Sequence, residues 1–274
     1  MSKMANLRLP VVAGTFYPQD AAKLSLQIEG FIDKKAKKTD CIACMLPHAG
    51  YIYSGRVAAQ TLSRINIKNK VILFGPNHTG SGAPFSIQTK GVWQTPLGDL
   101  KVESKLANAC LEHSDFLQAD SEAHLEEHSL EVELPILQYF KKDFEIIPIC
   151  LRLDGLSTLR DIGNAVAGAV KELKAQDSVL LVASSDMTHY EPAEEAARKD
   201  KQAIKAILEL DEEKLTKEVM GLDISMCGYA PVSAMLAAAK TLGAKSAELV
   251  MYQTSGDVTG DKTSVVGYAG IIIK

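Results

Sequence analysis

Short runs of continuous apolar residues constrain the fold of this chain more than any other feature. They occupy residues 41–46, 71–75, 144–151, 178–183, 247–253 and 264–273. A strand that is covered on both faces needs no polar residues on either face, so its sequence is an unbroken apolar run. We therefore predict buried strands at the first four positions and two further strands at 247–253 and 264–273.

Segments between these runs carry apolar residues at a spacing of three to four, the period of a helix that buries one side. They cover residues 54–65, 157–173, 193–210 and 230–242. Strands that alternate with helices are typical of an α/β fold. We predict a central sheet, largely parallel or mixed, with helices on both faces. The chain has no repeat, no low-complexity segment and no clear linker, so residues 1–274 are expected to form a single domain.

Composition and charge narrow the class of protein. The formal net charge is −4, and Lys and Arg cluster only in short pairs, so no nucleic-acid partner is expected. No apolar stretch approaches the roughly 20 residues of a membrane span, and the N-terminal residues contain no long apolar core of a signal peptide. The five cysteines are an odd, scattered set, which favours a reducing compartment over a disulfide framework. We expect a soluble, cytoplasmic protein with no membrane partner.

Residues with ligand-type side chains follow three of the predicted strands. His48 comes two residues after the first strand, and His78 lies just after the second. Asp186 and His189 follow the strand predicted at 178–183. Sites in open α/β sheets form at the carboxyl ends of strands, and parallel strands bring those ends to one edge. The sequence therefore predicts that these residues share one site, although each histidine alone is as well explained as a turn or core residue.

Cys227 precedes the predicted start of a helix at about Tyr229–Pro231. A thiol at a helix N-terminus has a lowered pKa, because the amide groups and the helix dipole favour the thiolate. The alternative is a buried cysteine that behaves as a small hydrophobe. Its position in the sequence leaves both interpretations open, and of the two we predict the reactive thiolate with a lowered pKa, which should label before the other four cysteines.

The stretch HLEEHSLEVELP contains a second histidine cluster. His124, Glu127 and His128 form a His-x-x-Glu-His pattern, and a helix would place the two histidines on one face. This pattern is also that of inverted zinc proteases, so a zinc hydrolase is one alternative. The other is a chance match in a polar helix start with acidic residues at its favourable end.

Seven motifs together resemble the MEMO family. In chain order they are AGTFYP at residues 13–18, PHAGYIYSG, GPNHTG, TPLGDL at residues 95–100, EEHSLEVELP, SSDMTHY and CGYAP. The resemblance extends over nearly the whole chain. The bacterial and archaeal branch is called AmmeMemoRadiSam system protein B, which implies an AMMECR-type protein and a radical SAM protein as partners. In fold, the family resembles the catalytic subunit of the class III extradiol ring-cleaving dioxygenases, which use non-haem iron(II).

The resemblance also implies roles for individual residues. His48 and His78 correspond to metal ligands, and Cys227 stands where the dioxygenases have a glutamate. His189 corresponds to the acid/base histidine, and Asp186 beside it is expected to orient the ring of His189 and set its tautomer.

Further residues are expected in the pocket. The resemblance places His128 and Glu131 on a helix that lines the site. Tyr51 and Tyr53 are expected to wall or hydrogen-bond the pocket, or else simply to pack. The implied cofactor is a divalent metal, with iron(II) as the first candidate. Two histidines and a thiolate form a softer ligand set, which also suits copper or zinc.

Three functions follow from these observations. The first is a non-haem, metal-dependent redox enzyme that acts on a small molecule, with His189 as the general base. The second is a metal- or peptide-binding protein without turnover that works in a complex. The third is the zinc hydrolase built on His124, Glu127 and His128. The substrate is not readable from the residues.

Overall fold

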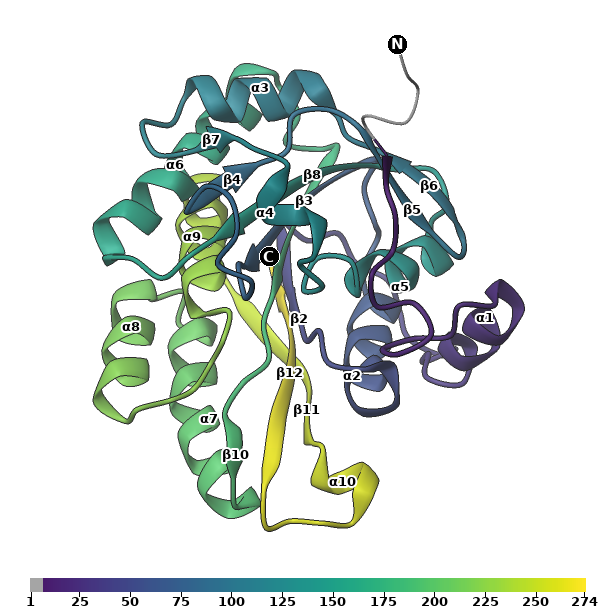
Figure 1. The fold of residues 1–274 in the computed structure, drawn as a ribbon. Coiled ribbons are helices and arrows are strands. Elements are labelled where there is room, and N and C mark those ends of the chain that lie inside the picture. Colours follow the sequence, from purple (N-terminus) through teal and green to yellow (C-terminus); the bar gives the residue numbers. More distant parts are fainter. Residues whose placement is uncertain (1–6) are drawn as a thin grey trace.

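The computed structural model describes residues 7–274, which form a mixed nine-stranded sheet flanked by helices, with a small second sheet (Figure 1). The strand order of the large sheet is β10-β12-β2-β9-β3-β8-β4-β7, and β11 pairs with β12 outside this path. The four central strands are β2 (Ala43–Leu46), β9 (Val179–Ser184), β3 (Lys70–Pro76) and β8 (Glu145–Leu151). These four are mutually parallel. Their carboxyl ends therefore lie at one edge of the sheet.

Antiparallel strands extend this parallel centre on both sides. On one side, β12 (Val265–Ile273) runs antiparallel to β2 and pairs with β10 (His189–Glu191) and β11 (Ala247–Thr254). On the other side, β4 (Phe85–Ile87) runs antiparallel to β8 and pairs with β7 (Gln118–Ala119). The second sheet consists of β1 (Leu7–Arg8), β5 (Val92–Thr95) and β6 (Gly98–Lys101).

Helices cover both faces of the large sheet, as Figure 1 shows. One face carries α3 (Ser104–Glu112), α6 (Leu156–Glu172), α7 (Ala193–Leu208), α8 (Glu212–Gly221) and α9 (Tyr229–Thr241). The other carries α1 (Ala21–Glu29), α2 (Tyr51–Ser63) and α5 (Glu133–Phe140). Two short helices, α4 (Glu122–Leu125) and α10 (Gly256–Thr259), lie in connections. Successive residues of a strand point to opposite faces: on β3, Ile72 and Phe74 join one core cluster, and Leu73 joins the other.

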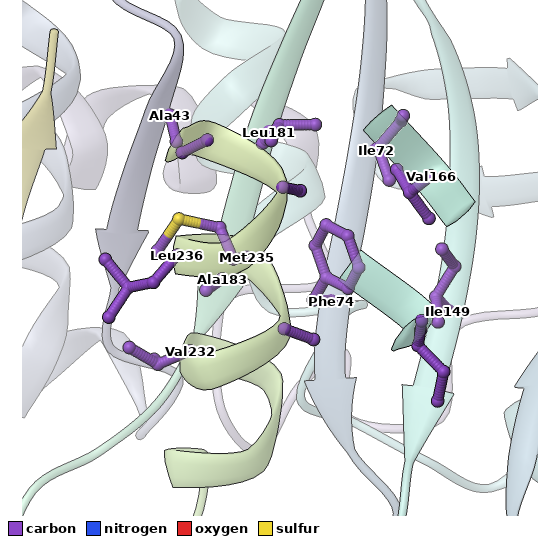
Figure 2. Packing of buried hydrophobic residues seen from close by; sticks show 14 of the residues in the cluster. Ala43, Ile72, Phe74, Ile149, Val166, Leu181, Ala183, Val232, Met235 and Leu236 are labelled. Atoms are coloured by element: carbon purple, nitrogen blue, oxygen red, sulfur yellow. The ribbon is translucent and has the colours of Figure 1, made fainter. Parts of the chain in front are cut away.

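The α9 helix is the central helix of its face. Figure 2 shows Val232, Met235 and Leu236 of α9 in the same cluster as Ala183 of β9 and Phe74 of β3. Every residue of α9 from 229 to 239 is buried, because α6 and α8 also pack against it. A helix that is apolar all round is typical of such a position.

The backbone of α6 packs tightly against α9 at Gly163. A β-carbon at this position would lie 2.2 Å from the main-chain carbonyl oxygen of Ala234. Gly163→Ala is therefore expected to lower the free energy of unfolding by about 2 kcal/mol or more, since the helices would have to move apart. Urea denaturation measures this loss. The control is Gly221→Ala, where a β-carbon meets nothing within 4 Å and stability should not fall; equal losses in both variants would contradict the prediction.

The predicted fold class is confirmed, and all six predicted strands are present with bounds that differ by at most two residues. The four predicted helices are also present, although α2 begins at Tyr51, three residues before the predicted start. The short edge strands and the helices α1, α3, α5 and α8 were not predicted. Within residues 7–274, none of the helices combines the length and the apolar character needed to cross a lipid bilayer.

Candidate functional site

Three neighbouring parallel strands each place a polar residue two positions beyond their ends. His48 follows Leu46 of β2, His78 follows Pro76 of β3, and Asp186 follows Ser184 of β9. Because the strand order is β2-β9-β3, the three residues meet at one edge of the sheet. The ring centroids of His48 and His78 are 5.3 Å apart.

Cys227 joins this edge from the start of α9. Its Sγ atom lies 3.4 Å from Nε2 of His48. Gly228, the N-cap of α9, makes the approach possible, since a β-carbon there would lie 2.4 Å from the carbonyl oxygen of Ser184. One ligand atom each from His48, His78 and Cys227 lies within 4.8 Å of the other two. The structure therefore brings together the three residues that the sequence analysis named as metal ligands.

Glu127 orients the ring of His78. Its Oε1 atom lies 2.9 Å from Nδ1 of His78, and its Oε2 atom accepts the main-chain N–H of His78 at 2.6 Å. Burial raises the pKa of Glu127, but hydrogen bonds from His78 and Ser129 outweigh this effect and lower the pKa to about 2. An ionised carboxylate only accepts hydrogen bonds, so Nδ1 of His78 carries the proton and Nε2 keeps its lone pair. A carboxylate in this position is a usual partner of a metal-ligating histidine.

The sequence analysis considered Glu127 only as part of a zinc hydrolase and missed this role. Glu127 and His78 are 49 residues apart in the chain, so no spacing pattern relates them. His78 lies in the GPNHTG motif and Glu127 in the EEHSLEVELP motif. The presence of both motifs in one family pattern was the available signal that the two residues could meet.

Asp186 supports the turn that carries His48, and it does not orient His189 as predicted. Its Oδ1 atom accepts the main-chain N–H of His48 at 2.9 Å. Burial raises the pKa of Asp186 to about 7, although hydrogen bonds from the amides of His48 and Ala49 oppose the shift. The side chain thus holds the turn after β2, and the ring of His189 has another partner.

A main-chain carbonyl orients His189 instead. Nδ1 of His189 lies 2.8 Å from the carbonyl oxygen of Ser225. A carbonyl cannot donate, so Nδ1 carries the proton and the neutral ring has its lone pair on Nε2. His189 lines the same pocket as His48 and His78. It is therefore placed to accept a proton there, with Ser225 in the role predicted for Asp186.

The pocket at this edge has an aromatic wall. Its lining includes His48, His78, His128, Asp186 and His189, together with the aromatic rings of Phe16, Tyr53, Tyr190 and Tyr268. Tyr190 is 78% exposed and has a positive φ of 61°. It stands at the register shift between β10 and β12, where an irregular pairing re-aims a side chain.

Two residues expected in this pocket lie elsewhere. Tyr51 is fully buried, and its hydroxyl donates to the carbonyl of Val132 at 2.7 Å, so it belongs to the core. Glu131 is also fully buried and holds the N-terminal segment, since it pairs with Arg8 at 2.7 Å and accepts from the hydroxyl of Tyr17 at 2.6 Å. The structure thus shows the packing alternative for Tyr51, and the expectation for Glu131 was wrong, because the sequence does not show which way a side chain near a site points.

The expected helix through His128 and Glu131 is a turn between α4 and α5. The guanidinium of Arg8 donates to the carbonyl oxygens of His124 and Glu127, each at 2.6 Å. In a continuous helix these carbonyls would accept from amides four residues later. Arg8 donates to these carbonyl oxygens in place of the amides, so the helix does not continue. His128 therefore lines the pocket from a turn.

The zinc-hydrolase triad is not assembled. His124 is fully buried, with Nε2 at 2.9 Å from the hydroxyl of Ser86 and Nδ1 at 3.4 Å from the thiol of Cys150. Burial lowers the pKa of His124 to about 3. Both ring nitrogens face core partners, whereas His128 faces the pocket. The helix that would align the two histidines is interrupted, and Glu127 and His128 lie instead with His78, in a second group whose ligand atoms are within 4.8 Å of one another.

The lowered pKa predicted for Cys227 is also corrected. Burial raises the pKa of its thiol above the usual value, and the negative charge of Asp186 acts in the same direction. The helix N-terminus does not overcome this desolvation. Cys227 remains distinct from Cys41, Cys44, Cys110 and Cys150, which are all buried, because it alone among the cysteines is partly exposed.

Alkylation of metal-free protein should show both the partial exposure of Cys227 and the raised pKa of its thiol. Cys227 is expected to label before the other four cysteines, because they are buried, but only slowly below pH 9, because its thiolate is scarce. Peptide mass spectrometry over a pH series measures this order. Labelling of Cys227 that is already fast at pH 7 would restore the original prediction of a reactive thiolate.

Comparisons with known proteins show the family of this chain. A family model described as "Memo-like protein" matches residues 8–272. A MEMO1 family protein of Methanococcoides burtonii is 44% identical over 98% of this chain and 100% of its own length. MEMO1 family proteins of Methanococcus maripaludis (42%, 97% of this chain and 99% of that protein) and Methanocaldococcus jannaschii (41%, 99% and 100%) are similarly related.

One solved structure shares the fold. The crystal structure of an uncharacterized protein from Escherichia coli K12 superimposes with a TM-score of 0.56, at 14% identity, over 83% of this chain and 98% of that one. The likeness is one of fold alone. The family model and the relatives cover almost the entire chain, and the protein is therefore a member of the Memo family.

Proposed function

We propose that this Memo family protein binds one divalent metal ion through Nε2 of His48, Nε2 of His78 and Sγ of Cys227. The observation that carries the proposal is that these ligand atoms converge within 4.8 Å. Glu127 adds support, since it holds a proton on Nδ1 of His78 and leaves the lone pair of the neutral ring on Nε2. Burial and the neighbouring His78 and His128 lower the pKa of His48, so its ring is neutral and able to bind a metal at neutral pH.

The donor set fits a redox-active metal. Three protein ligands leave open positions, and iron(II) bound this way would supply activation of oxygen or a substrate. We favour iron(II), with copper or zinc as alternatives because the thiolate is a soft ligand. The proposed reaction is the oxidation of a small molecule, in line with the expected relationship to the class III dioxygenases.

His189 is the proposed general base. The carbonyl of Ser225 holds the proton on Nδ1, so Nε2 of the neutral ring has a lone pair that can accept a proton from a substrate in the pocket. The aromatic side chains of Phe16, Tyr53 and Tyr268 would position an apolar substrate and exclude water. Association with AMMECR-type and radical SAM proteins stays a prediction.

A binding role without turnover is the second candidate. Two points favour it: by the resemblance, Cys227 stands where the dioxygenases carry a glutamate, and the pocket is lined by the aromatic rings of Phe16, Tyr53, Tyr190 and Tyr268. A pocket of this kind also suits a bound peptide side chain.

The experiment is elemental analysis of protein purified without air or chelator. Wild-type protein is expected to contain about one metal ion per chain, and His189→Ala should contain the same amount, because His189 acts on protons and is not a ligand. Oxygen uptake with candidate substrates should then be lost in His189→Ala and retained in wild-type protein of the same metal content. Metal-free wild-type protein that also cannot be loaded with iron(II), copper or zinc would contradict the proposal. Loss of metal in His189→Ala would make His189 a ligand.

A further inference from the structure

Behind His48 lies a hydrogen-bond network that the proposed function does not use. The hydroxyl of Ser184, at the end of β9, lies 2.8 Å from Nδ1 of His48. It also lies 2.8 Å from the carbonyl oxygen of Ser129 and 2.8 Å from Oε1 of Glu133. Ser184, Ser129 and Glu133 are fully buried, and His48 is 2% exposed. Groups of three other residues, His48, Ser129 and Glu133, thus meet at the oxygen of Ser184.

The protons of this network have one assignment that satisfies every contact. A hydroxyl has one proton and two lone pairs. The carbonyl of Ser129 can only accept, so the proton of Ser184 points toward it. His48 and Glu133 must then both donate to the oxygen of Ser184. This requires a proton on Nδ1 of His48 and a protonated carboxyl group on Glu133.

Glu133 has the surroundings of a neutral acid. Its second oxygen, Oε2, has no hydrogen-bond partner among residues 7–274. A buried carboxylate in that condition would be costly, whereas a neutral carboxyl group is tolerated. Burial raises the pKa of Glu133 well above its usual value, and the negative charge of Asp186 acts in the same direction.

We infer that Ser184, saturated by Ser129 and a neutral Glu133, is a positioning residue that fixes His48 in the Nδ1–H tautomer. This tautomer leaves the lone pair on Nε2, the atom that faces Cys227. The other tautomer would need the Ser184 proton to turn toward His48, and the buried carbonyl of Ser129 would then lose its partner. His48 is therefore prepared as a ligand in the absence of metal, as Glu127 prepares His78.

The molecule contains a matched control for this pair. Ser86 and His124 form a second fully buried serine–histidine contact, at 2.9 Å, outside the site. Removal of the Ser86 hydroxyl tests the cost of losing a buried hydroxyl. Removal of the Ser184 hydroxyl tests that cost together with the role in the site.

The experiment reads tautomers and cobalt(II) affinity in the same variants. In metal-free wild-type protein with ¹⁵N-labelled histidine, NMR should show His48 as the Nδ1–H form; an Nε2–H form would overturn the inference at once. Ser184→Ala should give a mixture of tautomers and weaken cobalt(II) binding about 10- to 100-fold, the usual effect of losing a partner behind a ligand. Ser86→Ala should change neither the His48 signal nor the affinity.

Two conservative variants separate the chemical role from a packing role. Ser184→Thr keeps the hydroxyl and should restore the tautomer and the affinity. Glu133→Gln keeps a donor without a charge, so both readouts should stay within about twofold of wild type. Unchanged tautomer and affinity in a folded Ser184→Ala variant would overturn the inference. Because Ser184 acts through a proposed ligand, its role rests on the proposed function, but the tautomer in metal-free protein is measured whether or not a metal binds.

Discussion

The double variant His48→Ala, His78→Ala is expected to bind no cobalt(II), whereas wild-type protein binds one ion per chain. Two of the three donors that converge within 4.8 Å are removed, and the remaining thiol of Cys227 cannot hold the ion alone. Cobalt(II) bound to a thiolate has a strong near-ultraviolet absorption band, so a spectroscopic titration reports both the stoichiometry and the presence of Cys227 as a ligand.

His113→Ala is the control for this prediction. His113 caps the end of α3 and contacts Glu172 of α6, away from the three strand ends. Its loss should leave the cobalt(II) titration unchanged. Wild-type stoichiometry in the double variant would remove His48 and His78 from the metal site, and binding without the thiolate band would remove Cys227.

Glu131→Ala is expected to lower the free energy of unfolding by about 3–5 kcal/mol, the usual cost of breaking a buried ion pair. The side chains of Arg8 and Glu131 are 3% and 0% exposed, so the variant leaves the guanidinium buried without a counter-charge. The amides of Val11 and Val12 and the hydroxyl of Tyr17 lose their acceptor at the same time. Denaturation in urea measures the loss.

The N-terminal segment should also become more accessible to protease in this variant, because Glu131 holds four of its groups. Glu29→Ala is the comparison, since the Glu29–Lys34 pair lies on the surface and its loss should not change stability measurably. A loss of stability in Glu131→Ala no greater than that of Glu29→Ala would show that the buried ion pair contributes nothing to the fold.

The parallel centre of the fold and the position of the site could be predicted from the sequence alone. An unbroken apolar run marks a strand covered on both faces, and its last residue marks the edge where a site can form. His48, His78 and Asp186 were therefore placed together correctly. The edge strands β4, β7 and β10 were not predicted, because two or three residues carry no periodic signal.

Tertiary structure alone decided which side chains face the pocket and which atoms carry protons. The helix expected through His128 is interrupted because Arg8, 120 residues earlier in the chain, donates to the carbonyl oxygens of His124 and Glu127. Glu127 and Ser225, from distant segments, set the tautomers of His78 and His189. Burial raised the pKa of Cys227 against the helix dipole. Local pattern determines strands and helices because their hydrogen bonds and burial repeat along the chain, whereas these contacts join segments whose proximity exists only once the sheet has formed.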